Sequence, residues 1–454
     1  MDFLNTIFAT IIALGVLVSV HEWGHFIVAR LCGVKVLTFS VGFGKQLVGR
    51  TGKQGTRFVL SAIPLGGYVR MLDEREGPVP SELKSQAFNN KSVFQRFAIV
   101  AAGPAVNLIF AVLAYAFIFT SGVTVVRPVV GELIPNSPAA QSGLPNNVEI
   151  LAINGQNSLS WGDVNTQLTA YIGETTDITL TVQPLNGSLS QQVTIQVNEW
   201  QFDIESQSPV SALGVIPWQP EIEPIIGQVV AGERAEQAGL QVGDRLLAID
   251  GEPIADWIGF VTRIQQSPQQ RLTLEVEREG MRQSLFITPK QREVSRDGQT
   301  VPMGYIGAGV QPYAWPESMQ RDINYGVFES IGQAAVKTYD TALMILDSIW
   351  KMIEGVISVK NLSGPITIAK VAGASAESGL ISFVSFMAYL SISLGVLNLL
   401  PIPMLDGGHL MFYLAEMLRG KPLPESIQAG FQRVGMALLF SLMGLAMFND
   451  ILRL

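Results

Sequence analysis

Three kinds of residue are scarce in this chain of 454 residues: charged side chains, cysteine and histidine. Charged residues make up 15% of it, against about 25% in an average soluble domain, which argues against a fully soluble protein. The net charge of −8 argues against a nucleic-acid partner, because such a partner requires a basic surface. The single cysteine, Cys32, excludes an intramolecular disulfide and a cysteine-based zinc site. Histidine occurs only three times, at His21, His25 and His409.

What is abundant is apolar sequence, gathered in four long stretches with few or no charges. A helix of about 20 apolar residues spans a hydrocarbon core of roughly 30 Å. We therefore predict transmembrane helices over residues 1–31, 93–121, 378–405 and 427–450. The last stretch has only sixteen uncharged residues, 434–449, so a buried core helix is the alternative there. No basic residue precedes the first stretch, so we interpret it as a retained helix and not as a signal peptide.

The charges between these stretches predict an orientation. Residues 30–96 hold eleven Lys and Arg against four Asp and Glu, whereas residues 127–377 hold fifteen against twenty-eight. Positive loops remain in the cytoplasm. We therefore expect four spans with both termini outside, a cytoplasmic loop over 32–92 and a large acidic region outside.

The acidic region contains an internal duplication. A shift of 96 residues aligns eleven identities in thirty-four ungapped positions, from Pro128 on Pro224 to Trp161 on Trp257. Each copy is predicted to form a strand, a short helix, a glycine turn, a strand, a second helix and alternating strands. One difference stands out, because Asn147-Val148 replaces the Gly243-Asp244 of the second copy.

The two copies resemble the PDZ domains of bacterial envelope proteases, and we assign them to residues 126–220 and 221–312. PDZ domains bind extended peptide ends by adding a strand to their sheet. The alternative is that the two domains act only as a steric cover.

Two further segments have a recognisable pattern. Residues 313–376 repeat apolar residues at helical spacing, which predicts one or two amphipathic helices that lie on the membrane surface or pack on the PDZ units. Residues 34–43 and 57–71 alternate apolar and polar residues around glycine-rich turns. This pattern predicts strands, either in a loop that dips into the membrane or in a cytoplasmic hairpin.

The motif with the clearest chemistry is His21-Glu22-Trp23-Gly24-His25, near the end of the first apolar stretch. Positions i and i+4 share one face of a helix, so both imidazoles can bind one metal ion, and Glu22 can act on its water. Ionisable residues inside an apolar span are costly and are functional by default.

A catalytic zinc site needs a third protein ligand and an open position. The end of the third stretch, Asn398 to His409, offers Asp406 and His409 three residues apart. Spacing alone leaves both open. The prolines and glycines there break a helix, and irregular backbone at membrane depth is tolerated only within protein or beside a cavity.

The HEWGH motif in a first span and the NLLPIPMLDGGH segment in a third resemble the paired signature of the site-two family of intramembrane metalloproteases. The resemblance implies one zinc ion per chain on His21, His25 and Asp406, with Glu22 as the base. It leaves His409 a hydrogen-bonding role beside the metal. For substrate binding it implies two groups of residues: Asn398, Pro401 and Pro403, and the Gly42-Phe43-Gly44 element of a re-entrant β-loop.

The resemblance also implies a biological role. Such enzymes cut the transmembrane segments of single-span proteins, such as anti-sigma factors that a first protease has trimmed, and remnant signal peptides. The implied place is the bacterial inner membrane, with periplasmic PDZ domains acting as a size filter and an active site near the cytoplasm. The alternatives are a membrane-anchored PDZ scaffold without activity and a metal transporter. The transporter is less favoured, because the second and fourth spans have no ionisable residues in their centres.

Overall fold

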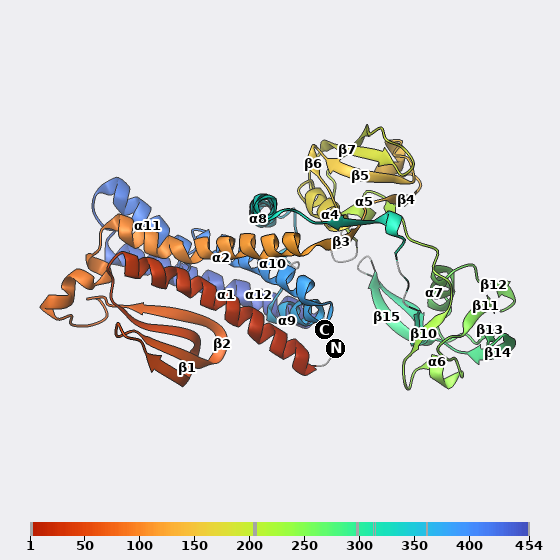
Figure 1. Cartoon of the computed structure of the whole chain (residues 1–454), viewed down its shortest axis with the longest axis horizontal. Coiled ribbons are helices and arrows are strands. Elements are labelled where there is room, and N and C mark those ends of the chain that lie inside the picture. Colours follow the sequence, from red (N-terminus) through yellow and green to blue (C-terminus); the bar gives the residue numbers. More distant parts are fainter. Residues whose placement is uncertain are drawn as a thin grey trace. The chain divides into compact units, whose positions relative to one another are not determined.

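A computed structural model describes residues 3–202, 207–296, 299–311, 313, 315–359 and 362–452. Residues 203–206 of the first predicted PDZ domain, and 297–298 and 312 of the second, lie outside the described residues. The chain divides into two compact units: residues 1–123 together with 322–454, and residues 124–321 (Figure 1). Each unit is described by itself.

Four helices of the first unit are long and apolar enough to cross a membrane: α1 (Phe3–Leu31), α2 (Val93–Ser121), α10 (Leu380–Leu399) and α12 (Glu425–Leu452). They agree with the four predicted spans, so the chain is a multi-span membrane protein. The third helix is shorter than predicted, because it ends at Leu399 and not at residue 405. A proline forces the preceding residue into extended backbone, and Leu400, before Pro401, has ψ 146°.

Helix α2 is the centre of this unit, since it packs against α1, α8, α10 and α11. It begins at a capping box in which Ser92 and Gln95 exchange side-chain and backbone hydrogen bonds. Two glycines allow close approach of its neighbours. Gly24 of α1 lies against the carbonyl of Ala102, and Gly395 of α10 lies against Pro104 of α2.

Three other helices complete the unit: α8 (Val327–Ile353), α9 (Pro365–Glu377) and α11 (Asp406–Arg419). The first two fall in the predicted amphipathic region, whose first part instead holds a 3₁₀ turn, Glu317–Met319, and strand β18 (Gln320–Ile323). One face of α8 packs on α2 and α10, while other apolar side chains, such as Phe328 and Trp350, remain exposed. The sequence reasoning did not predict α11.

The predicted strands of the loop form a long hairpin of β1 (Val36–Thr51) and β2 (Arg57–Met71), beside α1 (Figure 1). Residues 36–41 pair on one side with 67–71 and on the other with 57–60, and 48–51 pair with 57–60 as well. The hairpin therefore folds over itself into four strand segments. Among the described strands, residues 67–71 form one edge. Two 3₁₀ turns, Ser81–Gln86 and Phe88–Asn90, lead from the hairpin to α2.

The second unit contains two copies of one arrangement. The first copy comprises β4 (Val130–Leu133), α3 (Pro138–Gln141), β5 (Val148–Ile153), β6 (Gln156–Asn157), α4 (Trp161–Thr169), β7 (Thr176–Pro184), β8 (Gln191–Val197), α5 (Pro209–Ala212) and β9 (Val215–Pro217). The second comprises β10 (Ile226–Val229), α6 (Arg234–Gln237), β11 (Arg245–Ile249), β12 (Glu252–Pro253), α7 (Trp257–Gln265), β13 (Leu272–Arg278), β14 (Met281–Ile287), β15 (Lys290–Arg296), β16 (Gln299–Tyr305) and β17 (Ala308–Val310).

The sheets of the two copies have the same topology. Their four-stranded sheets run β6-β5-β7-β8 and β12-β11-β13-β14, and each copy adds a short pair, β4-β9 or β10-β17. The β15-β16 hairpin is an addition of the second copy. Strand β3 (Val123–Val126) pairs with β18 where the chain enters and leaves this unit.

The difference between the copies at their glycine turn leaves the turn itself intact. Asn147 has φ 57° and Gly243 has φ 94°, so both use the left-handed backbone that asparagine tolerates well. The position after the turn is buried in both copies, but its side chain is charged in one copy and apolar in the other. Asp244 is buried and accepts hydrogen bonds from Arg278 at 2.7 Å, which raise the pKa of that guanidinium above its usual value. The first copy has an uncharged pair there, because the equivalent positions are Val148, which is buried, and Pro184, its register partner across β5 and β7.

A second pair of equivalent positions carries an ion pair whose charges are exchanged. In the first copy Arg127 binds Glu149 at 2.5 Å, and in the second Glu223 binds Arg245 at 2.9 Å. The first pair is buried at the glutamate, which also meets Arg321 at 2.9 Å, whereas both partners of the second are exposed. The same contact therefore differs greatly in its surroundings.

We expect this difference to appear in local stability. Removing one partner of a buried pair leaves an incompletely compensated charge, whereas exposed pairs contribute at most about 1 kcal/mol. Arg127→Ala should lower the opening free energy of β5 and β7 by about 2 kcal/mol or more. The matched Arg245→Ala should change that of β11 and β13 by less than about 1 kcal/mol. Hydrogen exchange of the full chain measures both, and equal effects would contradict the prediction.

Candidate metal centre and active site

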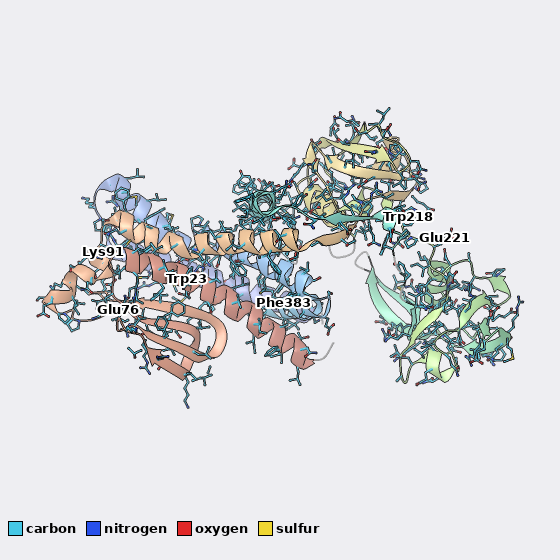
Figure 2. The ribbon with its side chains drawn as sticks, in the orientation of Figure 1. Trp23, Glu76, Lys91, Trp218, Glu221 and Phe383 are labelled. Carbon is cyan, nitrogen blue, oxygen red and sulfur yellow. The ribbon has the colours of Figure 1, made fainter. Side chains whose placement is uncertain are left out.

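The histidine motif lies on α1, and Trp23 marks its place in Figure 2. The helix continues unbroken through the motif, so His21 and His25 lie one turn apart on one face. Their Nε2 atoms are 3.2 Å apart, and their rings meet edge to face at 83°. Two imidazole nitrogens thus point to one location.

Asp406 reaches the same location from the break after α10. Its Oδ2 lies 3.1 Å from Nε2 of His21 and 3.5 Å from Nε2 of His25. The loop before it includes Met404 at φ 84°, a left-handed conformation that costs about 1–3 kcal/mol for such a residue and is found at functional sites. Gly407 lies directly against the backbone carbonyls of residues 399 and 400. The loop therefore folds tightly onto the start of α11.

Helix α11 is held at its other end by a buried ion pair. Glu416 accepts a hydrogen bond from Arg96 of α2 at 2.7 Å, and both side chains are 14% exposed. The guanidinium of Arg96 also lies over the ring of Tyr413, 5.0 Å from its centroid. Asp406 is thereby fixed relative to α2 as well as to α10.

Helix α2 forms the floor under the two imidazoles. A β-carbon at Gly103 would lie 2.6 Å from Cε1 of His25 and 2.8 Å from Cε1 of His21, so only glycine fits. Nδ1 of His25 lies 2.9 Å from the carbonyl oxygen of Ile99, and the Asn107 side chain lies 3.2 Å from Nδ1 of His21.

The hairpin approaches the site on the side of Glu22. A β-carbon at Gly67 of β2 would lie 3.0 Å from Cγ of Glu22 and 2.7 Å from the carbonyl oxygen of Ser40. The edge segment 67–71 therefore lies against the residue between the two histidines.

The three converging side chains fit a zinc ion. His21, His25 and Asp406 form the one group in the described part of the chain whose ligand atoms are close enough to share a metal. Oδ2 of Asp406 is buried and has no hydrogen bond, although it faces two nitrogens. Two imidazoles and one carboxylate are a donor set of catalytic zinc sites, which keep a fourth position for water. His409 is not in this group; its ring packs edge to face on Phe412, with centroids 6.3 Å apart.

The residues predicted to bind substrate lie in two places. Asn398 is half-buried near the end of α10, and Pro401 is exposed in the loop that follows. Pro403 is buried, because Gly435 of α12 packs directly on it.

The glycine-phenylalanine-glycine element lies where β1 folds back. Gly42 and Gly44 have φ 91° and 83°, and a β-carbon at Gly42 would meet the carbonyls of Ser61 and Ile63 at 2.9 Å. Phe43 packs directly on Gly66 and stacks on Tyr68, with 43% of its surface exposed. The glycines therefore have a backbone role in the bend, independent of any substrate.

Sequence reasoning missed the contributions of α2 and β2. Gly103, Ile99 and Gly67 carry no local signal, since their role is a close approach between distant segments. Asn107 had one, because it is a polar residue within a long uncharged stretch, where polar groups are costly.

A membrane-embedded pair of histidines, a glutamate between them and an aspartate from another helix define a metal-dependent hydrolase class. Comparisons with known proteins agree with it. The model of Peptidase family M50 matches residues 9–442. The chain is 46% identical to the regulator of sigma-E protease RseP of Salmonella typhimurium, over 98% of both chains. It is 44% identical over 100% of both chains to the RseP of Escherichia coli and to a putative zinc metalloprotease of Vibrio cholerae.

The chain therefore belongs to Peptidase family M50. It is a zinc metalloprotease of a bacterial membrane, as the paired motifs of its sequence predict.

The floor under the imidazoles gives a direct test of the site. Gly103→Ala should displace one or both rings and lower zinc affinity by about tenfold or more, the scale of changes in the support of a metal ligand. Gly15→Ala is the control, since Gly15 lies on α1, the helix that carries both histidines, and has nothing within 4 Å of its β-carbon. Competition with a zinc chelator measures both. Equal zinc affinity in the two variants would place the metal elsewhere.

Proposed function

We propose that this chain is an intramembrane protease that cuts transmembrane segments, with zinc held by His21, His25 and Asp406. One observation carries the proposal: three ligand atoms converge within 4.8 Å of one another beside Glu22, on helices long and apolar enough to cross a membrane.

The ion, when bound, supplies a Lewis acid that polarises a carbonyl and acidifies water. The protein supplies the rest. The Glu22 carboxylate accepts a proton from the attacking water and returns it to the leaving amine. Asp406 and the two imidazoles, fixed by α2 and α11, keep the reacting atoms within reach of that carboxylate.

A transmembrane substrate poses a problem, because its peptide bonds are engaged in helical hydrogen bonds. A helix that unwinds in lipid exposes N–H and C=O groups that need new partners. We assign this role to the edge segment 67–71, which can add the extended substrate as a further strand. The contact between Gly67 and Glu22 would place such a strand next to the base.

Two other groups of residues would bound the substrate. Asn398 lies near the end of α10 and exposed Pro401 lies in the loop after it, and we assign both of them contacts with the substrate backbone. Pro403 is packed under Gly435 and would act by shaping this loop. Phe43 with Gly42 and Gly44 would guide the substrate along the bend of β1. For His409 we propose a hydrogen bond beside the metal.

The names of the relatives suggest where this activity is used. Each is named a regulator of sigma-E protease. We propose that the chain likewise cuts single-span substrates, such as trimmed anti-sigma factors and remnant signal peptides, in the inner membrane. Residues 30–96 carry a net positive charge and residues 127–377 a net negative charge. This supports a periplasmic second unit and an active site near the cytoplasm.

We assign the two copies of the second unit to PDZ domains, which is supported by their shared topology and their sequence resemblance. Their proposed role is a size filter that keeps untrimmed substrates from the site, with peptide ends as their possible class of ligand.

The base can be separated from the metal by one isosteric change. Glu22→Gln should lower the rate of cleavage of a purified single-span substrate by about 10²–10⁴-fold, because the proton acceptor is lost. Zinc content should be unchanged. Glu329→Gln on α8, an exposed glutamate, is the control and should keep full activity.

His21→Ala and a chelator should each remove both zinc and cleavage. Undiminished cleavage by Glu22→Gln would refute the assigned base. If wild-type protein binds zinc and yet cuts nothing, the PDZ scaffold without activity becomes the better account.

The filter makes a separate prediction. Replacing residues 127–320 by a short Gly/Ser linker should allow cleavage of a substrate that keeps a folded exported domain. The parent chain should cut only the trimmed form. Cleavage rates for the trimmed form, compared between the two chains, control for damage to the membrane unit. Continued rejection of the untrimmed substrate would contradict the filter and the orientation on which it depends.

A further inference from the structure

The Nδ1 atom of each imidazole faces away from the proposed zinc ion and needs a hydrogen-bond partner of its own. This inference rests on that proposed site. Both histidines direct Nε2 to the shared location with Asp406. A neutral imidazole that binds a metal through Nε2 carries its proton on Nδ1, which is then a hydrogen-bond donor. Each Nδ1–H therefore needs an acceptor, and metal-binding histidines almost always have one.

His25 has such an acceptor. Its Nδ1 lies 2.9 Å from the carbonyl oxygen of Ile99, a group that can only accept. The proton of His25 is therefore fixed on Nδ1 and its Nε2 is left free for the metal.

His21 faces the side chain of Asn107, which is completely buried. The amide nitrogen Nδ2 lies 3.2 Å from Nδ1 of His21, while the amide oxygen Oδ1 is buried with no hydrogen bond. In this orientation the amide N–H points at Nδ1 of His21, and only a tautomer with its proton on Nε2 could accept from it.

Metal binding at Nε2 reverses the requirement. The proton moves to Nδ1, and two donors would then face each other across 3.2 Å. A rotation of the amide by 180° brings Oδ1 to the same position, so that it accepts from Nδ1–H. An asparagine side chain is the one amide of this length that offers either a donor or an acceptor from nearly the same place.

We propose that Asn107 is a positioning residue whose amide oxygen accepts a hydrogen bond from Nδ1–H of His21 when zinc is bound, which holds the ring with Nε2 toward the metal. The contact acts through His21 and does not reach the substrate. A neighbouring contact is independent of the amide, because the hydroxyl of Ser391 of α10 donates to the backbone oxygen of Asn107 at 2.9 Å.

The proposal predicts an order of zinc affinities that a space-filling role would not. Asn107→Leu keeps the volume and removes the acceptor, so it should weaken zinc binding by about 10–100-fold. Asn107→Asp keeps an acceptor at the same position and should bind zinc at least as tightly as the parent chain. If Asn107 only filled space, leucine would be tolerated and the buried carboxylate would be the more damaging change.

The experiment is a competition titration of zinc against a chelator of known affinity, on the purified full chain in detergent. Ser391→Ala is the control and should stay within about threefold of the parent, because the amide is untouched. Asn107→Leu with parent-like affinity, or Asn107→Asp weaker than Asn107→Leu, would overturn the inference. Zinc retained by His21→Ala would instead overturn the proposed metal site itself.

A measurement on the parent chain decides the matter if a variant does not fold. With Co²⁺ in place of zinc, proton NMR should show two strongly shifted Nδ1–H lines that both exchange slowly with D₂O. A second line that exchanges at once would mean that His21 has no acceptor, and the inference would be wrong.

Discussion

The close crossing of α1 and α2 is the constraint on which the membrane unit depends. Gly24 lies on the carbonyl of Ala102, so the two backbones meet there with no side chain between them, and Gly103 leaves room for both imidazoles. In lipid the hydrophobic effect does not drive helices together, and small residues at the interface allow the packing that does. The crossing brings the Ile99 carbonyl to His25 and the Asn107 amide to His21. A wider spacing would leave both histidines without partners.

The second element of the centre depends on a broken helix. Had α10 continued beyond Leu399, Asp406 would lie almost two turns further along it. Instead, residues 400–405 form a loop that brings the chain back to the end of α10, where Gly407 lies against the carbonyls of residues 399 and 400, and α11 begins at Asp406 itself. The Arg96–Glu416 pair then ties the far end of α11 to α2. Buried ion pairs are weak contributors to stability, so we interpret this one as a means of fixing α11.

Much of this could be predicted from the sequence, and the remainder could not for physical reasons. Long apolar stretches and an i, i+4 histidine pair are local patterns, so four helices and the motif were predictable. The duplication was visible because its glycines and apolar strand residues are identical. The ends of α10 and the whole of α11 were not, since the 398–409 segment mixes helix-breaking and apolar residues. The hairpin folds into four strand segments because the chain bends at the left-handed glycines Gly42 and Gly44. Which segments pair after that bend depends on tertiary contacts that the local sequence does not predict.

The two copies of the second unit show how far one fold can change its polar contacts. Arg127–Glu149 in one copy stands where Glu223–Arg245 stands in the other, and Asp244–Arg278 stands where Val148 and Pro184 stand. An exchange of both charges keeps the pair's attraction, and an uncharged pair avoids the cost of desolvation. In either case a single substitution would leave one charged side chain without its partner. The copies have therefore diverged by coupled pairs, which alignment position by position does not reveal.

The position of the edge segment 67–71 joins two requirements of proteolysis inside a membrane. A peptide bond can be attacked only after it leaves its helix, and its N–H and C=O groups then need partners that lipid does not supply. An edge strand supplies such partners in a fixed register. Because Gly67 lies against Glu22, a strand added at this edge would be extended and adjacent to the proposed base in the same step. Under this arrangement unwinding and cleavage need no separate sites, and the apolar, half-exposed hairpin is explained by the surroundings in which it would have to work.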